Sequence, residues 1–308
     1  MTHGQVRHPA AALAAVVLSF VLPFRAAAAV RVVTSTEGLA AIAREVGGDR
    51  VAAESLSRGV QDPHFVDANP VLAVKLRNAD LLVDVGLDLE IGWLPPLVLQ
   101  SRNGKILPGG ERRLTAASAV TVLDIPTGPV DRSLGDLHPA GNPHFLSDPR
   151  RALQVAGAVA DRLGRIDPAG AAVYQANLAA FRAKLDAAGS RWRAVLAPVK
   201  GHKLLSRHRT LTYFLDWSGL VTDGELEPRP GVPPPPGHLA DMVQVAQRHG
   251  VKAIVVENYY DTRSADVVAR HSGAKVVQVP GDVGGEPGVK TYERYIDTLV
   301  DRIAGALR

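Results

Sequence analysis

Histidine is the residue type in this chain with the clearest capacity for chemistry. The 308 residues include ten histidines and no cysteine, so a metal site has to use imidazole and carboxylate ligands without thiolate. His138 and His144 lie six residues apart in the segment DLHPAGNPHFLSDP. Gly141 and three prolines in this segment exclude a continuous helix, so the two histidines are not the adjacent-turn pair of a helical metal site. Each must be aimed by a loop and needs partners from elsewhere in the chain.

Four potential metal ligands follow predicted strands. They are His64 after residues 50–56, His144 in the long loop after residues 119–125, His208 after residues 202–206 and Asp282 after residues 275–279. In open α/β sheets, ligands bind beyond the carboxyl ends of parallel strands. Two of the four residues come from each half of the chain, so we expect them to meet in a cleft between two lobes. Three imidazoles and one carboxylate are a complete tetrahedral ligand set for Zn²⁺.

Each candidate has a simpler explanation when it is taken alone. A loop histidine is commonly a solvated group, and an aspartate after Pro-Gly commonly forms a turn or begins a helix. The joint placement of the four residues is what predicts a site. We interpret His138 as a bystander or as a residue that supports a ligand from behind. Glu286 is a substitute for Asp282, and Glu257 is a candidate for orienting an imidazole.

The elements that must position these residues follow an alternating pattern. Short β-branched runs alternate with helical patterns, which is typical of parallel sheets flanked by helices. The predicted strands are 30–34, 50–56, 80–86, 119–125, 202–206, 220–226, 251–257 and 275–279. The fold class is therefore α/β, with two similar lobes. Residues 168–197 form one long helical pattern, which we expect to connect an N-terminal lobe at 30–167 to a C-terminal lobe at 198–308.

The first 29 residues are predicted to be a signal peptide. A weakly basic start, an apolar run of 15 residues and the segment RAAAA indicate cleavage after Ala29, with an uncleaved anchor as the alternative. No later segment has 18 unbroken apolar residues, so we expect no membrane insertion. The segment carries two arginines and no acids, and its removal lowers the net charge from +4 to +2. Without a dense basic run, nucleic acid is not an expected partner.

Several segments, taken in order, resemble the zinc- and manganese-binding solute-binding proteins of ABC importers, the metal-binding cluster A-I family. The N-terminal lobe of that family resembles EVGGDRVAAESLSRGVQDPHFVDANPVLAVKLRNADLLVDVGLDLE. Its second and third metal-binding segments resemble DLHPAGNPHFLSDPRRA and KLLSRHRTLTYFLDWSGL. The likeness continues in GVPPPPGHLADMVQ, VVEN and ARHSGAKVVQVPGD, and it covers residues 30–308.

The resemblance implies two α/β lobes joined by a long rigid helix, with the metal in the cleft between them. It places His64, His144, His208 and Asp282 at the ligand positions. Members that handle manganese or iron tend to carry a carboxylate where this chain has His208, so the resemblance favours zinc. Imidazole-rich sites suit Zn²⁺, whereas carboxylate-rich sites suit Mn²⁺. This chain lacks the histidine-rich loop of many zinc-binding members and has an unusual VPGDVGGEPG context around Asp282.

The implied function is that of a monomeric periplasmic protein that captures Zn²⁺ and delivers it to an ABC transporter permease. A periplasmic metallochaperone is a further possible partner. A manganese- or iron-binding protein of the same fold is the alternative function. A zinc hydrolase is a lesser one, because four protein ligands would close the position that a catalytic zinc keeps for water. The chain also has no GxSxG, HExxH or P-loop motif, so we expect no enzymatic activity.

Overall fold

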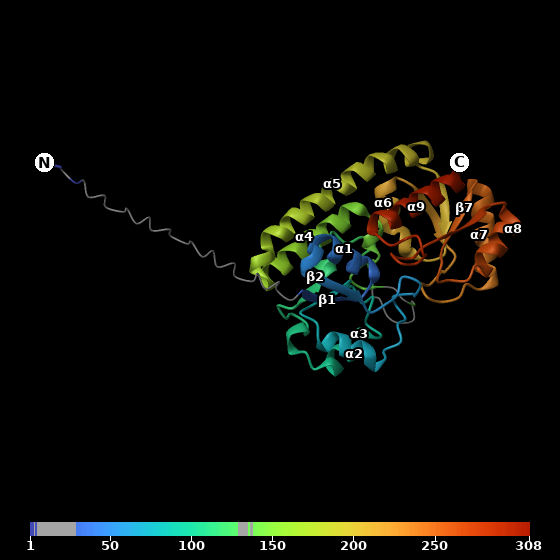
Figure 1. Ribbon diagram of the computed structural model, residues 1–308. Coiled ribbons are helices and arrows are strands. Elements are labelled where there is room, and N and C mark those ends of the chain that lie inside the picture. The colour runs from blue at the N-terminus through green and yellow to red at the C-terminus, as the bar shows by residue number, and fades with distance from the viewer. Residues whose placement is uncertain (3, 5–28, 129–134, 136–137) are drawn as a thin grey trace.

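Two four-stranded sheets organise the protein, and the paired strands in both sheets are parallel. The computed structural model describes residues 1, 2, 4, 29–128, 135 and 138–308. Apart from residues 1, 2, 4 and 29, the predicted signal peptide lies outside the described residues. The two sheets and their helices form two lobes that lie side by side (Figure 1), which confirms the predicted α/β fold class.

The sheet of the N-terminal lobe has the strand order β2-β1-β3-β4. Its strands are β1 (Val30–Thr34), β2 (Val51–Ser55), β3 (Leu81–Asp84) and β4 (Arg113–Thr115), and its helices are α1 (Glu37–Gly47), α2 (Pro70–Arg77), α3 (Leu94–Ser101) and α4 (Pro149–Ile166). Successive side chains of a strand point to opposite faces. In β3, Leu82 packs with α2 and α3, and Val83 packs with α1 and α4.

The C-terminal lobe repeats this plan with the strand order β6-β5-β7-β8. Its strands are β5 (Lys203–Ser206), β6 (Val221–Glu225), β7 (Ala253–Glu257) and β8 (Lys275–Val279), and its helices are α6 (Thr212–Ser218), α7 (Pro236–His249), α8 (Arg263–Ser272) and α9 (Tyr292–Leu307). In β7, Ile254 packs with α7 and α8, whereas Val255 belongs to the same core as α9. Both faces of each sheet are thus covered by helices.

One long helix, α5 (Ala171–Leu196), joins the lobes. Its 26 residues make it about 39 Å long. It contacts α1 and α4 of the N-terminal lobe and α9 of the C-terminal lobe, and Figure 1 shows it running along both lobes. Its buried side chains Phe181 and Trp192 belong to a core that contains residues of both sheets, such as Val83 and Val255. The predicted connecting helix is therefore present, with short 3-10 turns at Pro168–Gly170 and Ala197–Val199.

One predicted strand is wrong. Residues 119–125 form no strand, and the fourth strand of the N-terminal sheet is Arg113–Thr115. This short strand pairs with β3, although Leu114 is its one buried residue. The backbone N–H of Leu123 donates instead to the Tyr213 hydroxyl at 3.0 Å, which ties this segment to the C-terminal lobe. Among the described residues, none of the helices combines the length and the apolar character needed to cross a bilayer.

Candidate metal centre

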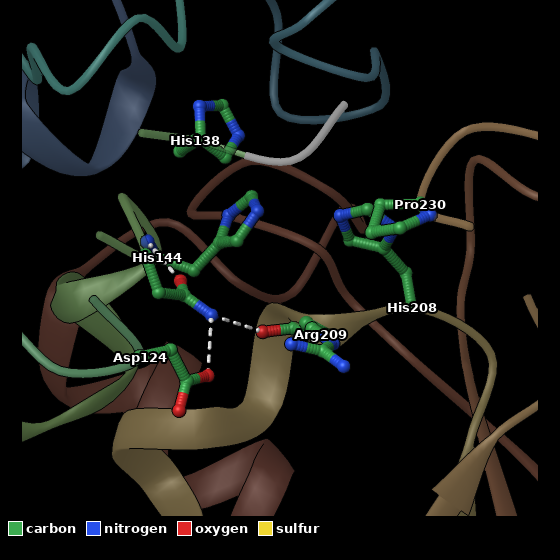
Figure 2. Close-up of a pocket in the computed structure, with 7 residues that line it drawn as sticks. Asp124, His138, His144, His208, Arg209 and Pro230 are labelled. Carbon is green, nitrogen blue, oxygen red and sulfur yellow. Dashed lines mark hydrogen bonds between the residues drawn. The ribbon is translucent and has the colours of Figure 1, made fainter. Parts of the chain in front are cut away.

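Three histidines from three different loops bring their ring nitrogens to one place. One ligand nitrogen from each of His64, His144 and His208 lies within 4.8 Å of the other two. No other group of three histidine or carboxylate ligands is as close in the part of the chain that the structure describes. Figure 2 shows His138, His144 and His208 among the residues that line one pocket. The structure thus brings together three of the four residues that the sequence predicts as ligands.

His64 lies in the loop between β2 and α2, where Asp62 holds it. The backbone N–H of His64 donates to Asp62 Oδ1 at 3.0 Å, and His64 Nδ1 lies 2.7 Å from the same oxygen. The indole N–H of Trp93 fixes the loop by donating to the Pro63 carbonyl at 2.9 Å. A proton on Nδ1, held by the carboxylate, leaves the lone pair on Nε2 for the site.

His144 lies in the loop that ends at α4, and Asn142 fixes this loop between the lobes. The Asn142 side-chain oxygen accepts from the His144 backbone N–H at 2.9 Å, while its amide nitrogen donates to the Arg209 carbonyl at 2.8 Å. Gly141 adopts φ +105°, a region that favours glycine. A Cβ at Gly141 would overlap with Val122 Cγ1. The loop therefore requires glycine here for both its conformation and its packing.

His208 follows β5 by two residues, as the sequence predicts. Its Nδ1 lies 3.0 Å from Glu227 Oε2, and that oxygen also accepts from the Gly231 backbone N–H at 2.9 Å. Arg207 forms an ion pair with the other Glu227 oxygen at 3.2 Å. His208 and Glu227 are both buried. The arrangement again places a carboxylate on Nδ1 and leaves Nε2 for a metal.

The surroundings act in opposite directions on the protonation of these imidazoles. Burial lowers the pKa of His144 well below its ordinary value, and the neighbouring His64 and His208 lower it further. Burial and the charge of His64 lower the pKa of His138 to about 4. Burial also disfavours a charged His208, but the Glu227 carboxylate, together with the charges of Glu257 and Asp62, outweighs this effect and raises the pKa of His208. Near neutral pH, His138 and His144 are therefore in the neutral form that binds metal.

The sequence reasoning missed both carboxylates that orient the imidazoles. Asp62 stands two residues before His64, and Glu227 follows the strand that ends at Glu225. The signal that could have revealed them is a carboxylate two residues away from a predicted ligand or from the end of a strand. The residue considered for this role, Glu257, is buried and accepts a hydrogen bond from the Thr210 hydroxyl instead.

Asp282 and Glu286 do not join the three nitrogens. Asp282 Oδ2 accepts from the Gly38 backbone N–H at 3.0 Å, at the beginning of α1, and Oδ1 accepts from the Val283 N–H at 2.8 Å. Burial raises the pKa of Asp282 to about 7. Glu286 forms a double hydrogen bond with the Arg302 guanidinium, at 2.7 Å and 2.6 Å. Both carboxylates are therefore engaged elsewhere in this conformation.

His138 lies closer to the site than the sequence reasoning expected. It is buried, and its Nε2 lies 3.3 Å from His64 Nε2. The His138 ring centroid is 5.4 Å from that of His64 and 6.4 Å from that of His144. His138 is thus a direct neighbour of one of the three clustered histidines.

The chemistry that this arrangement suits is coordination of a borderline cation. His144 Nε2 is buried and has no hydrogen-bond partner in the part of the chain that the structure describes. A buried nitrogen without a partner is costly in an ordinary fold, but it is what a metal ligand requires. Three imidazoles held within one small volume match the ligand preference of Zn²⁺. The chain's own residues therefore fit a bound zinc ion.

Comparison with known proteins also relates the chain to zinc-binding proteins. A family model described as "Zinc-uptake complex component A periplasmic" (ZnuA) matches residues 32–306. The high-affinity zinc uptake system protein ZnuA of Paracoccus denitrificans is 25% identical, with 98% of this chain and 99% of that protein covered. The zinc-binding lipoprotein AdcA of Streptococcus pneumoniae is 24% identical over 83% of this chain. The chain spans about half the length of AdcA, 51%.

The solved structures agree on the fold. A zinc-bound deletion mutant of ZnuA superposes with a TM-score of 0.75 at 24% identity, and the match covers 90% of this chain and 98% of that one. At this identity the likeness shows the fold alone. The family model, in contrast, matches nearly the whole chain after residue 31. The chain therefore belongs to the ZnuA family of periplasmic zinc-uptake components.

Proposed function

We propose that this protein captures Zn²⁺ between its two lobes and delivers it to the permease of an ABC importer. The observation that carries the proposal is the group of three imidazoles, two of them buried and that of His144 half-buried, whose ligand nitrogens lie within 4.8 Å of one another. The Nε2 of His144 supports it, because this buried atom has no hydrogen-bond partner among the described residues. Zinc is the cargo in this proposal, and we propose no catalytic activity.

The choice of zinc over manganese or iron rests on the donor atoms. A site made of imidazoles suits Zn²⁺, whereas Mn²⁺ prefers carboxylate, carbonyl and water ligands. His208 is the discriminating residue, because a carboxylate there would give the site a hard donor. The family model that matches the chain is described by zinc uptake, which supports the same choice.

We propose His64, His144 and His208 as ligands. The sequence reasoning assigns the fourth position to Asp282. For Asp282 to take that position, its carboxylate would have to leave the backbone N–H groups of Gly38 and Val283. Asp282 is therefore a proposed ligand for a state in which these two hydrogen bonds are broken.

The proposed setting is the periplasm, after cleavage of the signal peptide near Ala29. The proposed partner is an ABC permease with its ATPase. A periplasmic metallochaperone that loads zinc, and a monomeric state in solution, both stay predictions from the sequence.

Metal analysis of the purified protein tests the proposal. We expect one zinc per chain in the wild type, and strongly weakened binding in His208→Ala. His271→Gln is the matched control, because His271 is exposed at the end of α8. A competition titration with Zn²⁺ and Mn²⁺ then separates the two metals. Wild-type protein that binds no transition metal tightly would overturn the proposed function, and a preference for Mn²⁺ would overturn the choice of zinc.

A further inference from the structure

Helices α2 and α3 form an outer surface of the N-terminal lobe. They pack side by side on the sheet face that carries Leu82, and Figure 1 shows them on the side of the lobe away from α5. The Asn103 side-chain nitrogen donates to the carbonyls of Leu76 and Ala79, both at 2.9 Å. The carboxyl ends of the two helices therefore lie together, and the helices present one joint surface to the solvent.

Three large apolar side chains point outward from this surface. Val71 and Val74 of α2 are 65% and 48% exposed, and Leu99 of α3 is 71% exposed. Successive residues of an α-helix are rotated by about 100°. Val71 and Val74 thus lie opposite the buried side of α2, and Leu99 lies opposite the buried side of α3. Apolar side chains that gather on one exposed surface are typical of contact sites for proteins or membranes.

Three basic residues stand at the carboxyl ends of the same two helices. Arg77, Arg102 and Lys105 are exposed, and none of them forms an ion pair with a described residue. Arg77 Nε donates to the Ser101 carbonyl at 3.4 Å, which holds the guanidinium beside the end of α3. The positive charges are therefore next to one another at one end of the apolar surface.

The surface has no carboxylate of its own to balance these charges. Residues 70–77 and 94–106 contain no aspartate or glutamate. Their one other base, Lys75, pairs with Glu54 of β2 at 2.8 Å. Basic residues stabilise the carboxyl end of a helix, but this effect does not account for the exposed apolar side chains beside them. A phospholipid bilayer matches both features, because anionic headgroups cover its apolar interior.

We propose that this surface docks on a bilayer that contains anionic phospholipid. The docking residues are Val71, Val74, Arg77, Leu99, Arg102 and Lys105. The apolar side chains enter the boundary between headgroups and acyl chains, while the bases contact the phosphate groups. The contact is peripheral, because among the described residues no helix is long and apolar enough to cross a bilayer.

The inference goes beyond the proposed function and does not depend on the metal. None of the proposed zinc ligands belongs to α2 or α3. For the proposed function, docking would keep the carrier close to the membrane that holds its permease. The search for the permease would then run along a surface and not through the whole periplasm.

Flotation with lipid vesicles tests the proposal. The chain from Val30 onward is used, because it contains both lobes and lacks the apolar run of the predicted signal peptide. We expect binding to vesicles of equal parts phosphatidylcholine and phosphatidylglycerol at low ionic strength, and little binding to phosphatidylcholine alone. Added salt should weaken the binding, because it screens exposed charges. Arg102→Gln and Lys105→Gln should each weaken it by about fivefold. Arg182→Gln is the matched control, because Arg182 is exposed on α5.

A fluorescent probe at Leu99 shows which surface touches the lipid. The chain has no cysteine, so Leu99→Cys gives a single attachment site for an environment-sensitive fluorophore. Its emission should shift to the blue when phosphatidylglycerol vesicles are added. The same probe in Val173→Cys should not respond, because Val173 is exposed on α5. Leu99→Ser should weaken vesicle binding and leave zinc affinity unchanged, and circular dichroism shows whether each variant has folded.

The failure of binding to anionic vesicles would overturn the inference, and so would binding that the three substitutions leave unchanged. Sedimentation that shows two copies of the chain joined through Leu99 would overturn it as well. Binding only to vesicles that contain the permease would do the same, since a protein would then be the occupant. All of these outcomes leave the proposed function intact, because zinc affinity is measured without lipid.

Discussion

The Tyr260 hydroxyl donates a hydrogen bond to Asp62 Oδ2 at 3.0 Å. Tyr260 follows β7 in the C-terminal lobe, whereas Asp62 lies in the loop of the N-terminal lobe that carries His64. The other oxygen of Asp62 holds His64 Nδ1. One carboxylate therefore couples the orientation of a ligand in one lobe to a side chain of the other lobe.

Tyr260→Phe should weaken zinc binding by about tenfold, the lower end of the effect expected for a partner behind a ligand. The change removes one hydrogen bond and leaves the ring in place. Competition with a chelator of known affinity measures the effect. Tyr174→Phe is the matched control, because it removes the hydrogen bond to Asp167, which lies between α4 and α5. Equal zinc affinities in all three proteins would contradict the proposed coupling.

Glu227→Gln should weaken zinc binding by about 10- to 100-fold. The carboxylate holds His208 Nδ1 at 3.0 Å, and its charge makes the imidazole a stronger donor. Isothermal titration at fixed pH checks the result. Glu225→Gln is the control two residues earlier in the chain, because Glu225 faces Arg209 at 3.9 Å. An effect of equal size in both variants would show that the charge of the region matters and the contact with His208 does not.

The pH dependence of zinc binding should begin at His208. Glu227 raises the pKa of His208, so this imidazole gains its proton above its ordinary pKa of about 6.5 as the pH falls. Zinc must displace that proton, so the apparent affinity falls as the pH falls through the raised pKa. In Glu227→Gln the loss of affinity should begin at a lower pH. Proton release measured by titration in two buffers checks this, and an onset that does not move would contradict it.

Gly141→Ala should lower both stability and zinc affinity. The residue adopts φ +105°, and its Cβ would collide with Val122. We expect a loss of about 1–3 kcal/mol in the free energy of unfolding, as for other residues in unfavourable backbone regions. Denaturant unfolding gives this value. Gly201→Ala is the control, because Gly201 has φ +77° and open space around its Cβ position. Retained zinc affinity in Gly141→Ala would show that the turn does not position its histidines.

Glu90→Gln should change how stability depends on pH. Burial, with the nearby Asp84 charge, raises the pKa of Glu90 from 4.5 to about 7. The folded state therefore binds more protons than the unfolded state between pH 4.5 and about 7, and Glu90 makes the free energy of unfolding fall as the pH rises through this window. The shift corresponds to about 3 kcal/mol. Glutamine does not ionise, so the variant should gain stability relative to the wild type as the pH rises.

Denaturant unfolding of metal-free protein at several pH values tests the Glu90 prediction. Glu111→Gln is the control, because Glu111 is exposed on the surface. Parallel stability curves for the wild type and Glu90→Gln would show that Glu90 ionises as freely in the folded chain as in the unfolded one.

The strands with local apolar signals could be predicted from the sequence. Residues 30–34 and 275–279 are β-branched runs, and the structure has strands with the same bounds. The fourth strand of the N-terminal sheet, Arg113–Thr115, buries one leucine and has no such signal. Its pairing with β3 decides its conformation, and no property of three residues reveals that partner.

The site also has residues that the local sequence reveals and contacts that only the folded chain reveals. His64, His144 and His208 could be found because residue type and position relative to strands are both visible in a sequence. The pairing of Asp62 with His64 and of Glu227 with His208 depends on the paths of two loops. Nothing local in the sequence shows that His138 lies beside His64. The distance of 3.3 Å to His64 depends on how the turn packs between the lobes.

The core that α5 shares with both sheets has a thermodynamic consequence. The same buried cluster contains Val83 of one sheet, Val255 of the other and Phe181 and Trp192 of the helix between them. Melting one lobe would expose apolar surface of the other, so the two lobes should lose structure in a single calorimetric transition. An ion that binds only the folded protein would then raise the melting temperature of both lobes together, and not of one lobe alone.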